Sequence, residues 1–173
     1  DWSSDVCSAD LLAGCDLRDR MSAPRALAHN KFLVICDADG GPRAVWTGST
    51  NWTKTGLCTQ ANNALLVENP TLAQFYFEQW TALASEGAGS SDGLYDGNAA
   101  PRVSSKVRGT TVWFTPMRES RDLEQAGELI AGAEQGILFA MFNPGPRGTL
   151  LNDIIELASP ASPSFKPDLY IQG

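Results

Sequence analysis

The stretch His29-Asn-Lys-Phe-Leu-Val-Ile-Cys36 decides how the first half of this chain folds. Its polar start is followed by a continuous apolar run, which is typical of a β-strand covered on both faces. Asp37-Ala-Asp-Gly-Gly-Pro42 is rich in turn formers, and Arg43-Ala-Val-Trp-Thr47 has the composition of a second strand. Together these stretches predict a β-hairpin, with a polar loop after it at Gly48-Ser-Thr-Asn-Trp-Thr53.

Beyond this hairpin the pattern predicts a short strand, a helix and then a loop. Asn63-Ala-Leu-Leu-Val67 predicts the strand. Asn69 suits a helix N-cap and Pro70 the first helical position, so an amphipathic helix is expected over 70–86. Its expected buried face comprises Leu72, Phe75, Tyr76, Trp80 and Leu83. Gly, Ser and Asp dominate the following residues, which are typical of a linker or long surface loop over 87–110.

Strands and helices alternate again in the second half of the chain, which predicts an α/β layered fold. The elements expected there are a strand at 111–115, a helix over 121–134 capped by Ser120, a buried strand at 137–142, a loop at 143–148, a helix over 149–158 and a strand at 168–172. The segments so defined are residues 1–11 outside the fold, a first domain over 12–86, the linker over 87–110 and a second domain over 111–173.

Composition and charge exclude several classes of protein. The chain has 173 residues, of which 43% are apolar, so a packed core is expected. Its net charge of −7 disfavours a basic protein that coats nucleic acid, and no apolar run approaches the roughly 18 residues of a membrane span. The four cysteines form no C-x-x-C pair and there is one histidine, so no metal or cofactor is expected. Cys36 is expected to be a reduced, buried thiol.

Both ends of the chain are unusual. The first eleven residues, DWSSDVCSADL, resemble the translated sequence of a common sequencing-library adapter, so they are left out of the fold. The last residue, Gly173, comes directly after a predicted strand. We therefore expect the chain to be a fragment of a longer gene product.

Four polar side chains near the hairpin form a candidate site. His29 and Lys31 are two residues apart, so a strand would place both on one face. Ser49 and Asn51 have the same spacing, and the turn between the strands would fold them back beside the first pair. An ammonium and an amide stabilise the charge on phosphoryl oxygens, and a histidine nitrogen attacks phosphorus or protonates a leaving oxygen. The set therefore suits a phosphoryl group, without a metal.

These residues resemble the motif of the phospholipase D superfamily, H-x-K, four residues and D (HKD), followed by a G-S-x-N block. The resemblance covers residues 27–82, whereas 111–173 resemble the start of the family's second repeat only in their pattern of elements. It implies a layered α-β-α sandwich containing the C-terminal part of a first repeat and the start of a second. His29 would be the nucleophile that forms a phosphohistidine, or the partner acid. Lys31 and Asn51 would hold the phosphate, with Ser49 in support.

The acidic residue of the motif is displaced in this chain. The family's Asp would fall at Cys36, and Asp37 is one residue later. One residue reverses the face of a strand, so Asp37 fills this role only if the strand ends in a bulge or turn. Family members also build one active site from two motifs, whereas this chain holds one. The second motif would come from the missing C-terminal part or from a dimer mate, and the fragment alone is expected to be nearly inactive.

Several alternatives for the function stay open. The resemblance implies a phosphodiester hydrolase or transferase whose substrate is a lipid head group, a nucleic acid or a small molecule. The alternatives are a non-catalytic binding module with the same fold, or a nuclease of the same superfamily. Trp46 and Trp52 flank the candidate site and either line a substrate groove or contribute to the core. Asn51 also begins a glycosylation sequon, although the phosphate role accounts for the same residue.

Overall fold

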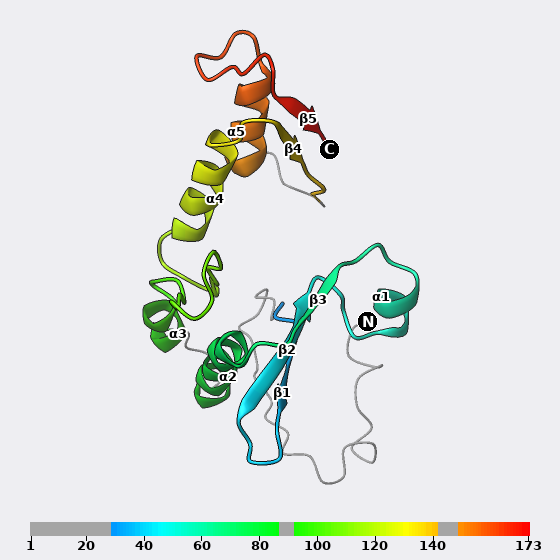
Figure 1. The fold of residues 1–173 in the computed structure, drawn as a ribbon, viewed down its shortest axis with the longest axis vertical. Coiled ribbons are helices and arrows are strands. Elements are labelled where there is room, and N and C mark those ends of the chain that lie inside the picture. Colours follow the sequence, from blue (N-terminus) through cyan, green and yellow to red (C-terminus); the bar gives the residue numbers. More distant parts are fainter. Residues whose placement is uncertain (1–28, 87–91, 142–148) are drawn as a thin grey trace. The chain divides into compact units, whose positions relative to one another are not determined.

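A computed structural model describes residues 29–86, 92–141 and 149–173 of the chain (Figure 1). The chain divides into two compact units. Unit 1 extends to Asn98 and includes Arg102–Pro116, and unit 2 comprises Ala99–Pro101 and Met117–Gly173. The mixture of helices and small sheets confirms the α/β class, and the finer layered sandwich stays a prediction. No helix in the described ranges is long and apolar enough to cross a membrane.

The sheet of unit 1 is built on the predicted hairpin. Its strands are β1 (Phe32–Cys36), β2 (Pro42–Gly48) and β3 (Ala64–Val67), all antiparallel and in the order β1-β2-β3 (Figure 1). The register pairs Phe32 with Thr47 and Gly48 with Ala64, and it shifts between Ile35 and Cys36. All three strands lie where the apolar runs predict them. The short helix α1 (Lys54–Cys58), between β2 and β3, was not predicted.

Helix α2 (Pro70–Ser85) covers one face of this sheet, against β1 and β2. The rings of Phe32 and Tyr76 meet edge to face, with their centroids 5.3 Å apart. The Asn69 side chain accepts hydrogen bonds from the backbone N–H groups of Thr71 and Leu72, which confirms the predicted N-cap. The expected burial of Trp80 is wrong, because its ring is 48% exposed and stacks on a neighbouring aromatic ring of the same helix.

Part of the opposite face of the sheet, around Leu33 and Leu66, is more open than the sequence predicts. Leu33 is 45% exposed and Leu66 is 59% exposed, so the expectation that the first strand is covered on both faces is wrong. In strands, successive side chains point to opposite faces. Helix α2 covers the Phe32 face, so Leu33 lies on the face that α2 does not cover. Cys36, expected to be buried, is an exposed free thiol, because it follows the register shift at the end of β1.

Residues 92–116 contain more structure than the loop expected over most of this stretch. Helix α3 (Asp92–Gly97) contributes Leu94, which is 1% exposed, and Asn98 is buried directly after it. The strand expected at 111–115 is wrong, because only Val112 pairs, in an isolated bridge to Arg102. Phe114 packs on the Tyr76 ring, so this segment contributes a buried aromatic side chain to the core of unit 1. Residues 87–91 lie outside the described part of the chain.

The described part of unit 2 contains two helices and two paired strands. Helices α4 (Arg121–Ala131) and α5 (Thr149–Ala158) pack on each other, and the strands β4 (Gly136–Leu138) and β5 (Tyr170–Gln172) pair in parallel. The predicted elements are therefore present, but β4 is shorter than predicted and not buried, since Leu138 is 75% exposed. Ser120 occupies the N-cap position without a side-chain hydrogen bond. The loop expected at 143–148 lies outside the described residues.

Lys166 explains where helix α4 ends. Its Nζ donates to the carbonyl oxygens of Ala131 at 2.6 Å and Ala133 at 2.8 Å. The backbone N–H of Lys166 donates in turn to Leu157 O at the end of α5. A cation at a helix C-terminus satisfies carbonyls that have no partner within the helix, so α4 ends at Ala131 rather than at 134.

The N-cap of α2 gives a test of unit 1. Asn69→Ala removes the acceptor of two backbone N–H groups, so we expect the free energy of unfolding to fall by about 1 kcal/mol. Asn69→Ser keeps a capping oxygen and should lose a few tenths of that amount at most. Urea denaturation followed by circular dichroism measures both. Equal stability of the alanine variant and the native chain would contradict this account of the helix start.

Candidate functional site

Lys31 lies at the open end of the hairpin. It directly precedes β1, and its carbonyl oxygen accepts a hydrogen bond from Thr47 Oγ1 at 3.5 Å. Alternation along the strand places its side chain on the face of Leu33, the face that α2 does not cover. Its Nζ donates to His29 O at 2.8 Å, and partial burial lowers the pKa of the ammonium below 10.5. The Lys31 ammonium is therefore held close to the backbone of His29.

His29 is an exposed residue before the first strand. Its carbonyl oxygen is tied to Lys31, which fixes the backbone between the two residues. Among the described residues, no hydrogen bond joins its imidazole to Ser49 or Asn51. The backbone of the H-x-K pair is thus fixed at the start of β1. The His29 ring has no hydrogen-bond partner among the described residues that would orient it.

Ser49 comes directly after β2, at the same end of the sheet. Its N–H donates to Asn63 O at 3.0 Å, and its hydroxyl lies 3.1 Å from Asn62 Oδ1, from Asn63 Oδ1 and from the Asn63 N–H. Gly48 has φ of +153°, and a Cβ there would lie 2.2 Å from Asn63 O. Only glycine allows this close approach of the two strands. Ser49 is therefore a connector that joins the β2 end to the start of β3.

Asn51 is positioned through its backbone. Helix α1 starts at Lys54, three residues after Asn51. The Thr53 side chain caps the helix by accepting a hydrogen bond from the Gly56 N–H at 3.0 Å. A Cβ on Gly56 would lie 2.3 Å from Asn51 O, so the first turn of α1 packs directly on the asparagine backbone. Asn62 Nδ2 donates to Gly56 O and closes the loop. The loop that carries Asn51 is thus held at both ends.

Asp37 lies at the other end of the hairpin. Its carboxylate accepts from the N–H groups of Asp39 at 3.1 Å and Gly41 at 2.8 Å, so it stabilises the turn between β1 and β2. The strand between Lys31 and Asp37 spans about 20 Å at the usual rise per residue. Asp37 could fill the acidic position of the motif only if β1 ended in a bulge or turn. The register shift before Cys36 is such an irregularity, but it leads into the turn between β1 and β2. The structure does not bring Asp37 together with the other site residues.

The charges of this region are unevenly distributed. Residues 40–67 contain Arg43 and Lys54 but no aspartate or glutamate, in a chain whose net charge is −7. The nearest acidic residues before and after this stretch, Asp39 and Glu68, lie toward the turn end of the hairpin, because Val67 pairs with Val45. An anion bound at the Lys31 end would therefore lie near cationic and amide side chains, and no carboxylate from these strands would face it.

Sequence reasoning missed three residues that hold this site, namely Gly56, Asn62 and Asn63. The signal for the asparagines was their adjacency at the start of a predicted strand, where amide side chains commonly bond to loop backbone. No signal pointed to Gly56, because its contact with Asn51 depends on the unpredicted helix α1. Trp46 and Trp52 contact each other, with ring centroids 5.5 Å apart, beside the site.

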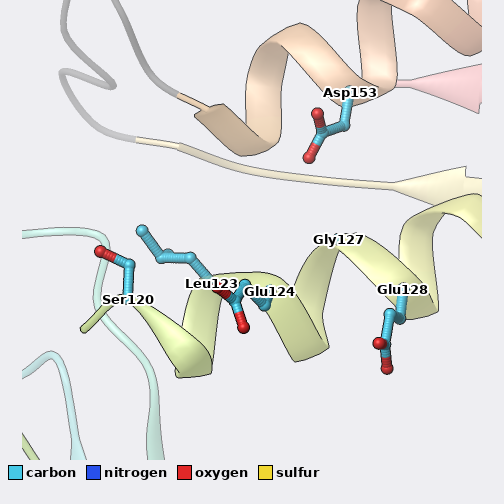
Figure 2. Close-up of a pocket in the computed structure, with 6 residues that line it drawn as sticks. All are labelled: Ser120, Leu123, Glu124, Gly127, Glu128 and Asp153. Carbon is cyan, nitrogen blue, oxygen red and sulfur yellow. The ribbon is translucent and has the colours of Figure 1, made fainter.

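A pocket lies elsewhere, in unit 2, between α4 and α5 (Figure 2). It has a volume of about 530 Å³, and its lining includes the carboxylates of Glu124, Glu128 and Asp153. Figure 2 shows Asp153 projecting from α5 toward α4, where it lies close to Gly127. A phosphate would be repelled there. In the part of the chain that the structure describes, no group of three or more His, Cys, Asp or Glu could hold a metal ion.

Comparison with known proteins shows a similarity between the segment that contains the hairpin and one protein family. Residues 3–83 match the family model described as the PLD-like domain of cardiolipin synthase. No curated protein and no solved structure matches the chain. The matched residues include the H-x-K pair, the G-S-x-N block and most of α2. Residues 3–83 of this chain are therefore similar to the phospholipase D superfamily.

Proposed function

We propose that the Lys31 end of unit 1 binds the phosphoryl group of a phosphodiester and takes part in its hydrolysis or transfer. The observation that carries the proposal is the register of the hairpin, which brings Lys31 level with Gly48 and next to Ser49. The match of residues 3–83 to a PLD-like family model supports a phosphodiester as the substrate. The absence of carboxylates from residues 40–67 supports an anionic ligand at this end.

Each side chain has a role that its surroundings support. The Lys31 ammonium and the Asn51 amide would donate to the non-bridging oxygens of the phosphoryl group. Ser49 and Gly56 would hold the Asn51 loop, since their contacts are with Asn62, Asn63 and the Asn51 backbone. Asp37 would act only through the turn, because its carboxylate already accepts from two backbone N–H groups there.

The proposed reaction proceeds in two displacements through His29. A ring nitrogen attacks phosphorus, the bond to the leaving oxygen breaks, and an acid supplies that oxygen with a proton. Water, or an alcohol in a transferase, then loses a proton to a base and displaces the histidine. The products are a phosphomonoester, or a new phosphodiester, and the released alcohol.

The reaction needs a second acid–base group, and this chain has no second histidine to supply it. His29 is the sole histidine in the sequence, so a site with two HKD motifs requires another motif from outside these residues. We propose a dimer mate or a further segment as its source. A non-catalytic binding module is the second candidate, because the His29 ring has no described hydrogen-bond partner to orient it.

Covalent trapping separates the two candidates. We expect the protein completed by its second motif to form an acid-labile, base-stable phosphohistidine with a phosphodiester labelled at phosphorus, and His29→Ala to abolish it. Lys31→Ala should weaken tungstate binding by about tenfold or more, since it removes a charge-assisted contact. Titration calorimetry measures the affinity. The binding module would be supported if the completed wild type binds tungstate but never becomes labelled.

The lowered pKa of Lys31 predicts a pH dependence. Burial lowers this pKa below 10.5, and only the protonated amine binds an anion, so tungstate affinity should fall as pH rises through a midpoint below 10.5. Tungstate keeps the same charge over this range. Lys31→Arg should bind without the fall, because a guanidinium stays protonated. A parallel fall in both proteins would show that another group titrates.

Gly56 provides a test of how Asn51 is positioned. In Gly56→Ala the new Cβ would lie 2.3 Å from Asn51 O, so the loop must shift and tungstate affinity should drop by about tenfold. Gly97→Ala is the matched control within unit 1, because a Cβ there meets nothing within 4 Å. Unchanged affinity in Gly56→Ala, or an equal loss in both variants, would contradict the proposed role of the loop.

A further inference from the structure

Three aromatic rings connect the start of β1 to a segment far along the chain. The Tyr76 ring on α2 contacts Phe32, with centroids 5.3 Å apart and planes at 68°, and it also contacts Phe114, at 5.0 Å and 85°. Edge-to-face pairs of this kind contribute stability beyond the area that they bury. We call Phe32, Tyr76 and Phe114 the aromatic column. Each ring comes from a different segment, so the column ties β1, α2 and residues 112–116 together.

Phe114 lies between two backbone anchors. Two residues before it, Val112 forms a bridge with Arg102 through hydrogen bonds of 2.8 Å and 3.1 Å. Two residues after it, Pro116 O accepts a hydrogen bond from the buried Asn98 side chain at 3.2 Å. Phe114 is itself buried. The segment therefore presents a buried ring on a backbone that is held on both sides of it.

The other end of the aromatic column adjoins the phosphate site. Phe32 directly follows Lys31 and pairs with Thr47, whose hydroxyl donates to Lys31 O at 3.5 Å. Because successive side chains of a strand point to opposite faces, packing of the Phe32 ring against α2 turns Lys31 to the other face. The two residues share one peptide bond, so a displacement of Phe32 moves the Lys31 backbone with it.

We propose that Phe114 is a positioning residue that acts on Lys31 through the aromatic column. The inference rests on the function proposed above in one respect, namely that Lys31 binds the anion. Packed cores contain few voids and transmit displacements, and a small misplacement of a binding group weakens its contacts. Phe114 lies beyond residues 3–83, so the family model that matches those residues gives it no role. This segment thus supports the site from outside the matched part of the chain.

Lysine NMR on the 173-residue chain tests the proposal without any ligand. Side-chain signals of isotope-labelled lysine follow the pKa of each ammonium, and Lys31→Arg assigns the Lys31 signal. Phe114→Leu keeps an apolar side chain and removes the ring, so we expect the start of β1 to loosen and the pKa of Lys31 to rise toward 10.5 as its ammonium is hydrated. Tungstate affinity at neutral pH, measured by calorimetry, should fall by about fivefold in the same variant. Tyr76→Phe keeps the middle ring and should change neither quantity.

Leu94→Val is the matched control, because Leu94 belongs to the core of unit 1 but not to the aromatic column. It should lower the melting temperature without changing the pKa of Lys31 or the tungstate affinity. All variants are compared at a temperature where circular dichroism shows that they are folded.

Two results would overturn the proposal. One is a folded Phe114→Leu variant that keeps the native pKa of Lys31 or, in a chain that binds tungstate, the native affinity. The other is an equal shift of that pKa in Leu94→Val, which would reveal general loosening of the core. If the native chain binds no tungstate while Phe114→Leu still shifts the pKa of Lys31, the phosphate site fails and the link between Phe114 and Lys31 stands.

Discussion

The antiparallel register between β1 and β2 is the constraint on which the candidate site depends. Because Phe32 pairs with Thr47, Lys31 reaches the end of the hairpin at the level of Gly48. A slip of one residue would turn Lys31 to the face covered by α2 and move the G-S-x-N loop away from it. Gly48 is part of the same constraint, because any side chain there would collide with the Asn63 backbone.

Much of unit 1 could be predicted because its signals are local. The apolar runs and turn formers defined the three strands, and Asn69 with Pro70 defined the start of α2. The errors came from tertiary packing. Apolar runs do not reveal which face stays open, so Leu33 was expected to be covered. Leu94 could not be assigned to the core, because its helix lies in a Gly- and Ser-rich segment whose composition is typical of a loop.

The site residues were predicted by spacing, and their supports were not. The H-x-K and G-S-x-N spacings identify His29, Lys31, Ser49 and Asn51, and the register brings Lys31 and Ser49 to one end of the sheet. Asp37 lies in the turn at the other end of the hairpin, where its carboxylate bonds to turn backbone, and its role in the motif stays a prediction. These features leave a short cationic end on an acidic chain, which is the physical basis for proposing an anionic ligand.

Crystallography of the chain with tungstate tests the central claim most directly, because the heavy atom marks the anion without ambiguity. The account predicts tungstate at the Lys31 end of the hairpin, within hydrogen-bonding distance of Lys31 Nζ and Asn51 Nδ2, with the His29 ring beside it. It would be contradicted by tungstate bound elsewhere with this end unoccupied, or by a His29 ring directed away from an anion that Lys31 and Asn51 hold.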